Sequence, residues 1–279
     1  MKTQRTAAVL GSALLLFAAA ASAQVVKYVR YSEGGRTSFG ILEGEQIREL
    51  DRSPIDGGKP TGKTTALSSV KLLAPVEPSK VIAVGLNYKS HIGDREPAPY
   101  PGLFAKFPTC IVGPEAEIVY PEGANNVHFE GELVIVIGKK ASKVSKADAK
   151  QYIFGVTAGN DLSERDWQRD DLQWFRAKAA DNFGPLGPAI VTGLNHNDLL
   201  LQTRVNGKVL QKQRTSDLLF DVEDIVSYIS QYVTLLPGDV IYTGTPGSTS
   251  AMKPGDVVEI EIEGIGILRN KIAGSSTDH

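Results

Sequence analysis

The chain has 279 residues, with 30 basic and 32 acidic side chains and a formal net charge of −2. No basic cluster stands out, which argues against nucleic acid as a partner. Cys110 is the only cysteine, so an intrachain disulfide is excluded and a buried structural thiol is the expected role.

The first 23 residues have the pattern of an export signal. A basic start at Lys2 and Arg5 precedes an apolar stretch that is short for a membrane span, and Ala21-Ser22-Ala23 fits the small-residue cleavage pattern. We therefore expect cleavage after Ala23 and export, to a bacterial periplasm, with no membrane contact afterwards. The alternative is an uncleaved membrane anchor.

Composition divides the mature chain in two. Residues 24–72 are expected to form a small N-terminal β unit and a linker, because strand-like runs at 25–31, 38–42 and 47–50 precede a stretch rich in proline and glycine that reaches residue 80. Residues 73–274 are expected to form the catalytic domain.

One motif in the linker is misleading. Residues 57–64 match the phosphate-loop pattern G-x-x-x-x-G-K-[ST]. That loop needs a buried strand before it and a helix after it, and neither pattern is present here. We therefore reject a nucleotide site.

The larger part of the chain is rich in strand patterns. Strands are expected at 81–85, 103–112, 117–120, 154–159, 189–191, 201–210, 239–242, 257–262 and 266–272, and helices near 145–152, 163–175 and 220–233. Asn206-Gly207 predicts a tight hairpin turn. Many strands, few helices and no β-α-β alternation predict a β-rich α+β fold, as a barrel or a sandwich.

Two carboxylates stand at the entrance of an apolar strand. Glu130 and Glu132 are two residues apart, so on a strand they share a face. Two such anions repel each other and resist desolvation, which a bound cation would relieve. Asp161, directly after another strand, could be a third ligand, and three hard oxygen ligands favour Mg²⁺, Mn²⁺ or Ca²⁺ over Zn²⁺. The alternatives are a solvated strand end and an ordinary turn residue.

Candidates for acid–base chemistry lie elsewhere in the chain. His91 follows a strand, with Asp94 three residues on, and such a pair can titrate near neutral pH and take a proton from water. His128 shares the face of the two glutamates and could be a further ligand or a supporting partner. Solvated loop positions are the alternative for both histidines.

Cationic and glycine-rich segments complete the candidate set. Arg165, on a polar helical segment, and Lys178, in the loop expected after it, could hold a substrate carboxylate or stabilise an enolate. Residues 243–247, Thr-Gly-Thr-Pro-Gly, could present backbone N–H groups to an anion.

Six ordered motifs carry a resemblance to a known family. They are Gly85-Leu86-Asn87-Tyr88-x-x-His91, Glu130-x-Glu132-Leu133, Asn160-Asp161-x-Ser163-x-Arg165-Asp166-x-Gln168, Lys178-x-x-Asp181, Pro185-x-Gly187-Pro188 and Pro237-Gly238-Asp239-x-Ile241-x-Thr243-Gly244-Thr245-Pro246. Together they resemble the fumarylacetoacetate hydrolase family over residues 80–272.

The resemblance implies a mixed β-sandwich roll, a homodimer and one Mg²⁺ or Mn²⁺. It assigns Glu130, Glu132 and Asp161 as metal ligands, His91 as the general base and Lys178 as the enolate-stabilising lysine. Gln168 and Thr245 match positions near the substrate, and Arg165 joins them as the substrate-binding candidate named above.

The chain departs from the family pattern at two positions. Asp94 stands where the family has glutamate, so either Asp94 or Glu96 is expected to orient His91. His128 stands where the family often has aspartate.

The hypothesis that follows is a divalent-metal-dependent hydrolase. It would cleave a carbon–carbon bond in an acylpyruvate-like or other β-diketo acid, with His91 activating water and the cation and Lys178 stabilising an enolate. Isomerisation or decarboxylation of 2-oxo dicarboxylic acids at the same site is an alternative. A non-catalytic periplasmic protein that binds oxo acids is another.

We expect the exported protein to start at Gln24, because the cleavage pattern ends at Ala23. Intact-mass measurement of the periplasmic fraction of an expressing bacterium checks this. A chain that keeps residues 1–23 in the membrane fraction would support the anchor instead.

Overall fold

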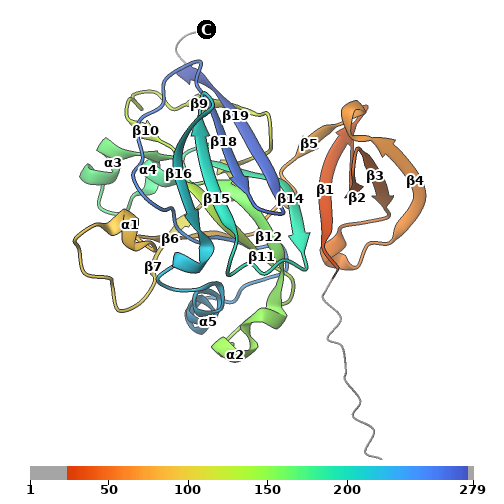
Figure 1. Cartoon of the computed structure of the whole chain (residues 1–279), viewed down its shortest axis with the longest axis horizontal. Coiled ribbons are helices and arrows are strands. Elements are labelled where there is room, and N and C mark those ends of the chain that lie inside the picture. The colour runs from red at the N-terminus through yellow and green to blue at the C-terminus, as the bar shows by residue number, and fades with distance from the viewer. Residues whose placement is uncertain (1–23, 276–279) are drawn as a thin grey trace, which may run out of the picture.

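The computed structural model describes residues 24–275, so the predicted export signal lies outside the described residues. Figure 1 shows a small unit of strands beside a larger body. The small unit holds β1 (Val26–Glu33), β2 (Arg36–Glu43), β3 (Gln46–Leu50), β4 (Pro60–Ala66) and β5 (Lys71–Leu73). β1 also pairs with β14 (Gly184–Thr192) of the larger body, so one sheet runs through both parts.

The main sheet continues through the larger body. From β14 its order is β12 (Ile153–Asn160), β11 (Gly131–Ile137), β17 (Val240–Tyr242), β6 (Val81–Gly85) and β7 (Gly102–Lys106), and the short β8 (Ile111–Val112) pairs with β14. Every residue of β11 is buried, which the apolar run from Leu133 to Ile137 predicts for a strand covered on both faces.

A second sheet packs across the main one. Its order is β16 (Lys208–Arg214), β15 (Leu200–Val205), β18 (Val257–Ile262), β19 (Gly266–Ser275) and β9 (Glu117–Tyr120). Asn206 and Gly207 turn the β15–β16 hairpin with positive φ, which confirms that prediction. Leu133 and Ile135 of the main sheet share one core with Leu201 and Ile260 of the second. A small separate pair joins β10 (Val127–His128) to β13 (Ser163–Glu164).

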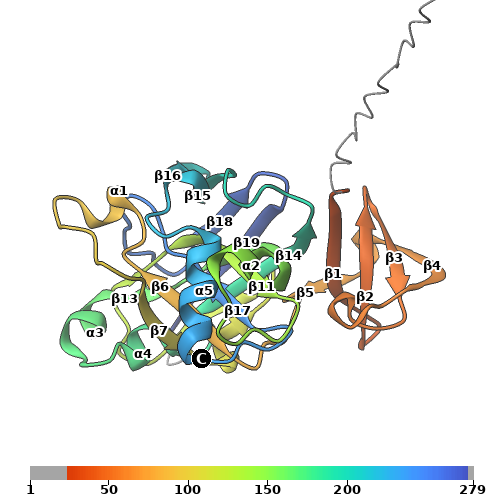
Figure 2. The same cartoon turned by 90° about the horizontal axis from the view of Figure 1, so that it is seen from below.

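The helices are short apart from one. They are α1 (Lys89–Ile92), α2 (Lys146–Ala149), α3 (Arg165–Asp170), α4 (Phe175–Ala179) and α5 (Val222–Tyr232). The apolar face of α5 is buried in the core, and Figure 2 shows this helix in front of the sheets when the molecule is seen from below. The strand-rich α+β prediction is confirmed. Within residues 24–275, no helix has the length and apolar character needed to cross a membrane.

Several local predictions are wrong. The strand expected at 103–112 is divided, because β7 ends at Lys106 and β8 begins only at Ile111. The expected linker contains β4 and β5. Within the described residues β4 is an edge strand that pairs with β3 alone, and it is largely exposed. Its sequence therefore lacks the apolar–polar alternation of a half-buried strand. The expected helix at 163–175 is divided among β13, α3 and α4, which places Lys178 in a helix instead of a loop. His91 lies in the short helix α1 and not in a loop. Residues 60–64 of the phosphate-loop match belong to β4, so the segment is not a loop that leads into a helix, in agreement with the rejection of a nucleotide site.

The start of α5 is tied to the rest of the body by an acidic side chain. Glu223 accepts hydrogen bonds from His196 Nε2 at 2.9 Å and Asn197 Nδ2 at 2.8 Å. The bond from His196 outweighs burial and lowers the pKa of Glu223 from its ordinary 4.5 to about 2. Because the folded-state pKa is depressed, this carboxylate stabilises the fold above pH 4.5, and the contribution is lost as pH falls toward 2.

We therefore expect Glu223→Gln to lower the free energy of unfolding at pH 7 by about 1 kcal/mol. The difference from wild type should shrink as the pH is lowered from 4.5 toward 2. Urea unfolding across this range measures it, with the exposed Glu45→Gln as the control. A difference that does not change with pH would contradict this account of Glu223.

Candidate active site

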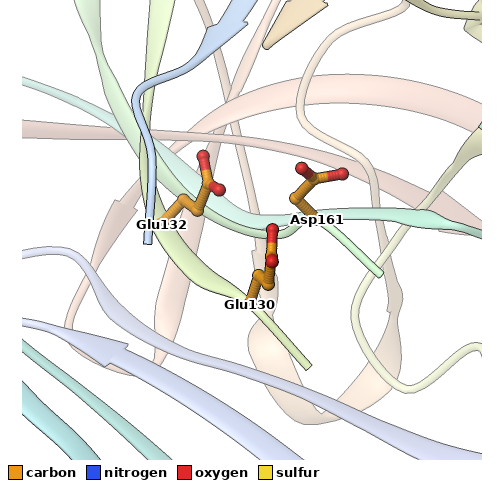
Figure 3. Close-up of side chains that lie close together, drawn as sticks. All are labelled: Glu130, Glu132 and Asp161. Atoms are coloured by element: carbon orange, nitrogen blue, oxygen red, sulfur yellow. The ribbon is translucent and has the colours of Figure 1, made fainter. Parts of the chain in front are cut away.

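Three carboxylates meet where two strands of the main sheet pair. Glu130 lies between β10 and β11, Glu132 is the second residue of β11, and Asp161 follows β12. The antiparallel pairing of β11 with β12 brings the start of one strand beside the end of the other, and the Asp161 N–H donates to the Glu130 carbonyl at 2.8 Å. One carboxylate oxygen from each residue lies within 4.8 Å of the others, and Figure 3 shows the three groups pointing into one space.

Cationic side chains surround these carboxylates. Lys178 Nζ donates to Glu130 Oε2 and to Asp161 Oδ2, each at 2.7 Å. Lys106 Nζ, at the end of β7, donates to Asp161 Oδ1 at 2.7 Å and to the backbone carbonyl of Lys178. Arg165 donates to Glu130 Oε1. Both lysines are buried, so these ion pairs are shielded from water.

Lys106 was not among the site residues predicted from the sequence. It is a lone cation in an otherwise apolar strand pattern, and that signal alone does not say which anion it meets. Its partner Asp161 follows β12, far from Lys106 in the sequence, and only the tertiary fold brings the two together.

The positive charges of the basic residues compensate the three carboxylates to different degrees. Burial raises the pKa of Glu130, but the charges of Lys178 and Arg165 outweigh it and hold that pKa well below its usual range. Burial, with Asp161 and Glu130 adding to it, raises the pKa of Glu132 well above its usual range. Burial opposes the charge of Lys178, yet Asp161 and Glu130 raise its pKa above the ordinary value. Glu132 is therefore the carboxylate whose charge is least compensated.

The donor set fits a hard divalent cation. Glu132 Oε2 accepts from the Gly244 N–H at 2.7 Å, and no other partner of this carboxylate occurs within residues 24–275. A cation beside Glu132 would compensate the charge that the three basic residues leave unbalanced. The three carboxylates supply only oxygen, which suits Mg²⁺ or Mn²⁺.

His91 approaches the same space from α1. Its Nδ1 lies 2.6 Å from the Gly247 carbonyl, and because a carbonyl only accepts, Nδ1 must carry the proton. In neutral His91 the other nitrogen, Nε2, is then free to accept a proton. Asp94 and Glu96 are exposed, and no hydrogen bond joins either to His91 in the described part of the chain. In this structure the partner of His91 is thus a backbone carbonyl instead of the expected carboxylate.

One cavity collects most of the predicted site residues. Those lining it are His91, Glu130, Glu132, Arg165, Gln168, Lys178 and Thr245. Asp161 is buried and accepts a hydrogen bond from Lys178, and neither Asp161 nor Asp94 is among the residues on the cavity wall. The remaining wall consists of Val84, Gly85, Leu86, Phe104 and Trp174, none of which was among the site residues predicted from the sequence.

His128 has a supporting position. Its Nδ1 lies 2.9 Å from Thr249 Oγ1 and its Nε2 lies 2.9 Å from Asn126 Oδ1. Thr249 in turn accepts from Arg165 at 2.8 Å, so His128 reaches Glu130 only through Thr249 and Arg165. His128 is not one of the clustered carboxylate ligands.

Cys110 is buried, and burial raises the pKa of its thiol to about 11. A thiolate is the reactive form, so the structural role expected for this cysteine agrees with its environment.

Comparison with known proteins finds similar sequences and structures. Residues 80–273 match the family model described as fumarylacetoacetate (FAA) hydrolase C-terminal, and residues 26–75 match the one described as Rv2993c-like, N-terminal. A crystal structure of 5-carboxymethyl-2-hydroxymuconate delta-isomerase from Mycobacterium smegmatis is 44% identical, has a TM-score of 0.84, and the match covers 89% of this chain and 99% of that one.

Two further relatives differ in the reactions that they are named for. The mitochondrial oxaloacetate tautomerase FAHD2A of Homo sapiens is 42% identical over 220 residues, which cover 74% of this chain and 70% of that protein. Maleylpyruvate hydrolase from Sphingobium sp. SYK-6, whose structure contains manganese (II) and pyruvate, is 27% identical with a TM-score of 0.75. That match covers 90% of this chain and all of the other.

If the carboxylates form a cation site, Glu132→Gln should abolish metal binding and leave the metal-free fold intact. The amide oxygen can still accept from Gly244, while one buried, poorly compensated charge is removed. We expect the melting temperature of EDTA-treated protein to rise by about 2–4 °C, and the further rise that Mn²⁺ gives the wild type to disappear.

The matched control is Glu117→Gln, which changes an exposed strand residue and should leave the response to Mn²⁺ unchanged. Differential scanning calorimetry with and without Mn²⁺ measures both variants. A full response to Mn²⁺ in Glu132→Gln would exclude this residue as a ligand.

Proposed function

The chain belongs to the fumarylacetoacetate hydrolase family, and from this premise we propose that it is a divalent-metal-dependent enzyme that interconverts the keto and enol forms of a small 2-oxo acid. The match over residues 80–273 confirms the family resemblance seen in the sequence motifs. The observation that carries the proposal is the arrangement of His91: Nδ1 donates to a backbone carbonyl, and Nε2 is left as a base beside the cavity that holds the buried carboxylates.

In the proposed reaction the protein moves one proton. His91 Nε2 takes it from the carbon next to the oxo group, and protonation of the oxo oxygen completes the enol, so one C–H bond breaks, one O–H bond forms and no co-reactant is needed. Lys178 and Arg165 offset the negative charge that develops on the substrate. A divalent cation held by the carboxylates would supply Lewis acidity to the oxo group.

The charges around the cavity favour an anionic substrate. When all six groups are charged, the positive charges of Lys106, Lys178 and Arg165 equal the three carboxylate charges in number, although their ion pairs reach Glu130 and Asp161 and leave Glu132 without one in the described residues. A divalent cation would then leave an excess of positive charge, which an acid with two carboxylates would neutralise. The named activity of the human relative, oxaloacetate tautomerase, concerns such a dicarboxylic acid. We therefore propose a 2-oxo dicarboxylic acid as the substrate class.

Carbon–carbon bond hydrolysis is the second candidate. It is favoured by the likeness to a maleylpyruvate hydrolase whose structure holds manganese and pyruvate. His91 would then take its proton from water, and the bond between the attacked carbonyl carbon and the enolate fragment would break. The hydrolase predicted from the sequence stays a prediction, as do decarboxylation and oxo-acid binding without turnover.

Two further proposals concern the location of the protein and its assembly. We propose that the protein acts after export, on the strength of the signal-like residues 1–23, and that it forms a homodimer, as the family resemblance implies.

The test is a product-resolved assay with Mg²⁺ and Mn²⁺ on enol-oxaloacetate and on acylpyruvates. Tautomerisation removes enol absorbance without a change of mass, hydrolysis consumes water and gives two fragments, and decarboxylation releases CO₂. We expect tautomerisation by the wild type, and a fall in kcat of about 10²- to 10⁴-fold in His91→Gln, because the base is lost.

Asp94→Asn is the matched control and should stay near wild type, since Asp94 does not contact His91. Equal rates for wild type and His91→Gln would contradict the role of His91. No turnover of any oxo acid would contradict the proposed function.

A further inference from the structure

A buried glutamine of the second sheet reaches into the candidate site. Gln211 lies on β16 and is only 3% exposed. Its Nε2 donates to Thr245 Oγ1 at 2.8 Å and to the Pro246 carbonyl at 2.6 Å, and its Oε1 accepts from the Gly131 N–H at 3.2 Å. Both ends of the amide are therefore used, and all of these partners belong to the neighbourhood of the carboxylates.

Through these bonds Gln211 connects the carboxylate strand to the loop at 243–247. Gly131 stands between Glu130 and Glu132, and its carbonyl accepts from Thr245 Oγ1 at 2.9 Å. The two sheets are close here, since a Cβ on Gly131 would lie 2.1 Å from Thr203 Oγ1. Only glycine permits this approach, which brings the glutamine amide to the backbone between the two glutamates.

The far end of the same loop holds His91. The Gly247 carbonyl, one residue beyond the Pro246 carbonyl that Gln211 binds, accepts from His91 Nδ1 at 2.6 Å. The Gly247 N–H donates to Ser90 Oγ at 3.0 Å, and Ser90 Oγ donates to Gln213 Oε1 at 2.5 Å. Two glutamines of one strand thus brace the loop to which His91 is bound.

We propose that Gln211 is a positioning residue, which fixes the loop at 243–247 against Gly131 and so holds His91 in the Nδ1–H tautomer with Nε2 as the base. Gln211 acts through Pro246 and Gly247 and does not itself touch the reacting atoms. This proposal rests on the proposed function only in taking His91 as the catalytic base. The coupling of Gln211 to the tautomer of His91 stands apart from any reaction.

The role requires an amide. Glutamate could still accept from Gly131 but could not donate to the Pro246 carbonyl, and methionine of similar length could do neither. Gln211→Glu therefore keeps part of the connection, whereas Gln211→Met removes all of it. Gln202→Met on the adjacent β15 is the matched control, because the Gln202 side chain makes no hydrogen bond within residues 24–275.

The experiment combines ¹⁵N NMR of histidine-labelled, Mg²⁺-loaded protein with steady-state kinetics at a temperature where each variant is folded. The His91 signal is assigned with His91→Gln. We expect the wild type and Gln202→Met to show the Nδ1–H tautomer, and Gln211→Met to shift toward the Nε2–H form that predominates in free histidine. We expect kcat of Gln211→Met to fall by about 10- to 100-fold with little change in KM or in Mn²⁺ affinity.

Gln211→Glu should lie between Gln211→Met and the wild type, and it replaces the methionine variant if that variant does not fold. An unchanged His91 tautomer together with an unchanged kcat in both variants would overturn the positioning role. A shifted tautomer in a protein whose wild type turns over no oxo acid would support the positioning role and overturn the proposed function. A lower melting temperature with unchanged kcat and tautomer would show a structural role only, and would likewise overturn the proposal.

Discussion

The burial of three carboxylates in one space is the constraint on which the rest of this site depends. Anions so placed repel one another and lose hydration, so the fold must supply compensating charge. It does so with two buried lysines and one arginine, which arrive from β7, α4 and α3. Glu132 receives the least of this compensation, and its environment is the one that a divalent cation would complete.

The base comes from a separate part of the fold, so its orientation relative to the carboxylates must be fixed by contacts with another segment. His91 lies on a four-residue helix after β6, too short to fix its own orientation, while the carboxylates are set by the pairing of β11 with β12. The loop at 243–247 follows β17, which pairs with both β11 and β6, so it lies between the two groups. This loop donates hydrogen bonds to Glu132 and to the Gly131 carbonyl and accepts one from His91, so it connects the carboxylates to the base.

The sequence predicted what local patterns determine and missed what tertiary contacts determine. Glu130 and Glu132 could be placed on one face because strand periodicity is local, and the strand-rich class followed from the many short apolar runs. Lys106 and Gln211 were missed because their partners are distant in the sequence and are brought close only by the tertiary fold. The helix that carries Lys178 has only five residues, too few to show a helical period. Nearness in sequence also does not establish contact: in the described residues no hydrogen bond joins Asp94 or Glu96 to His91, whose Nδ1 bonds the Gly247 carbonyl instead.

The central claim is that metal-loaded protein uses His91 to move a proton at the carbon next to an oxo group. Deuterium exchange at that carbon of a 2-oxo dicarboxylic acid, followed by NMR in D₂O with Mg²⁺, tests it most directly. Exchange requires that a base remove the C–H proton, which is the step that tautomerisation also requires, so it reports the action of the base whatever the final product is. The account predicts rapid exchange with the wild type, and exchange near the uncatalysed rate with His91→Gln or after metal removal. Exchange that is equally fast in His91→Gln, or absent from metal-loaded wild type, would contradict it.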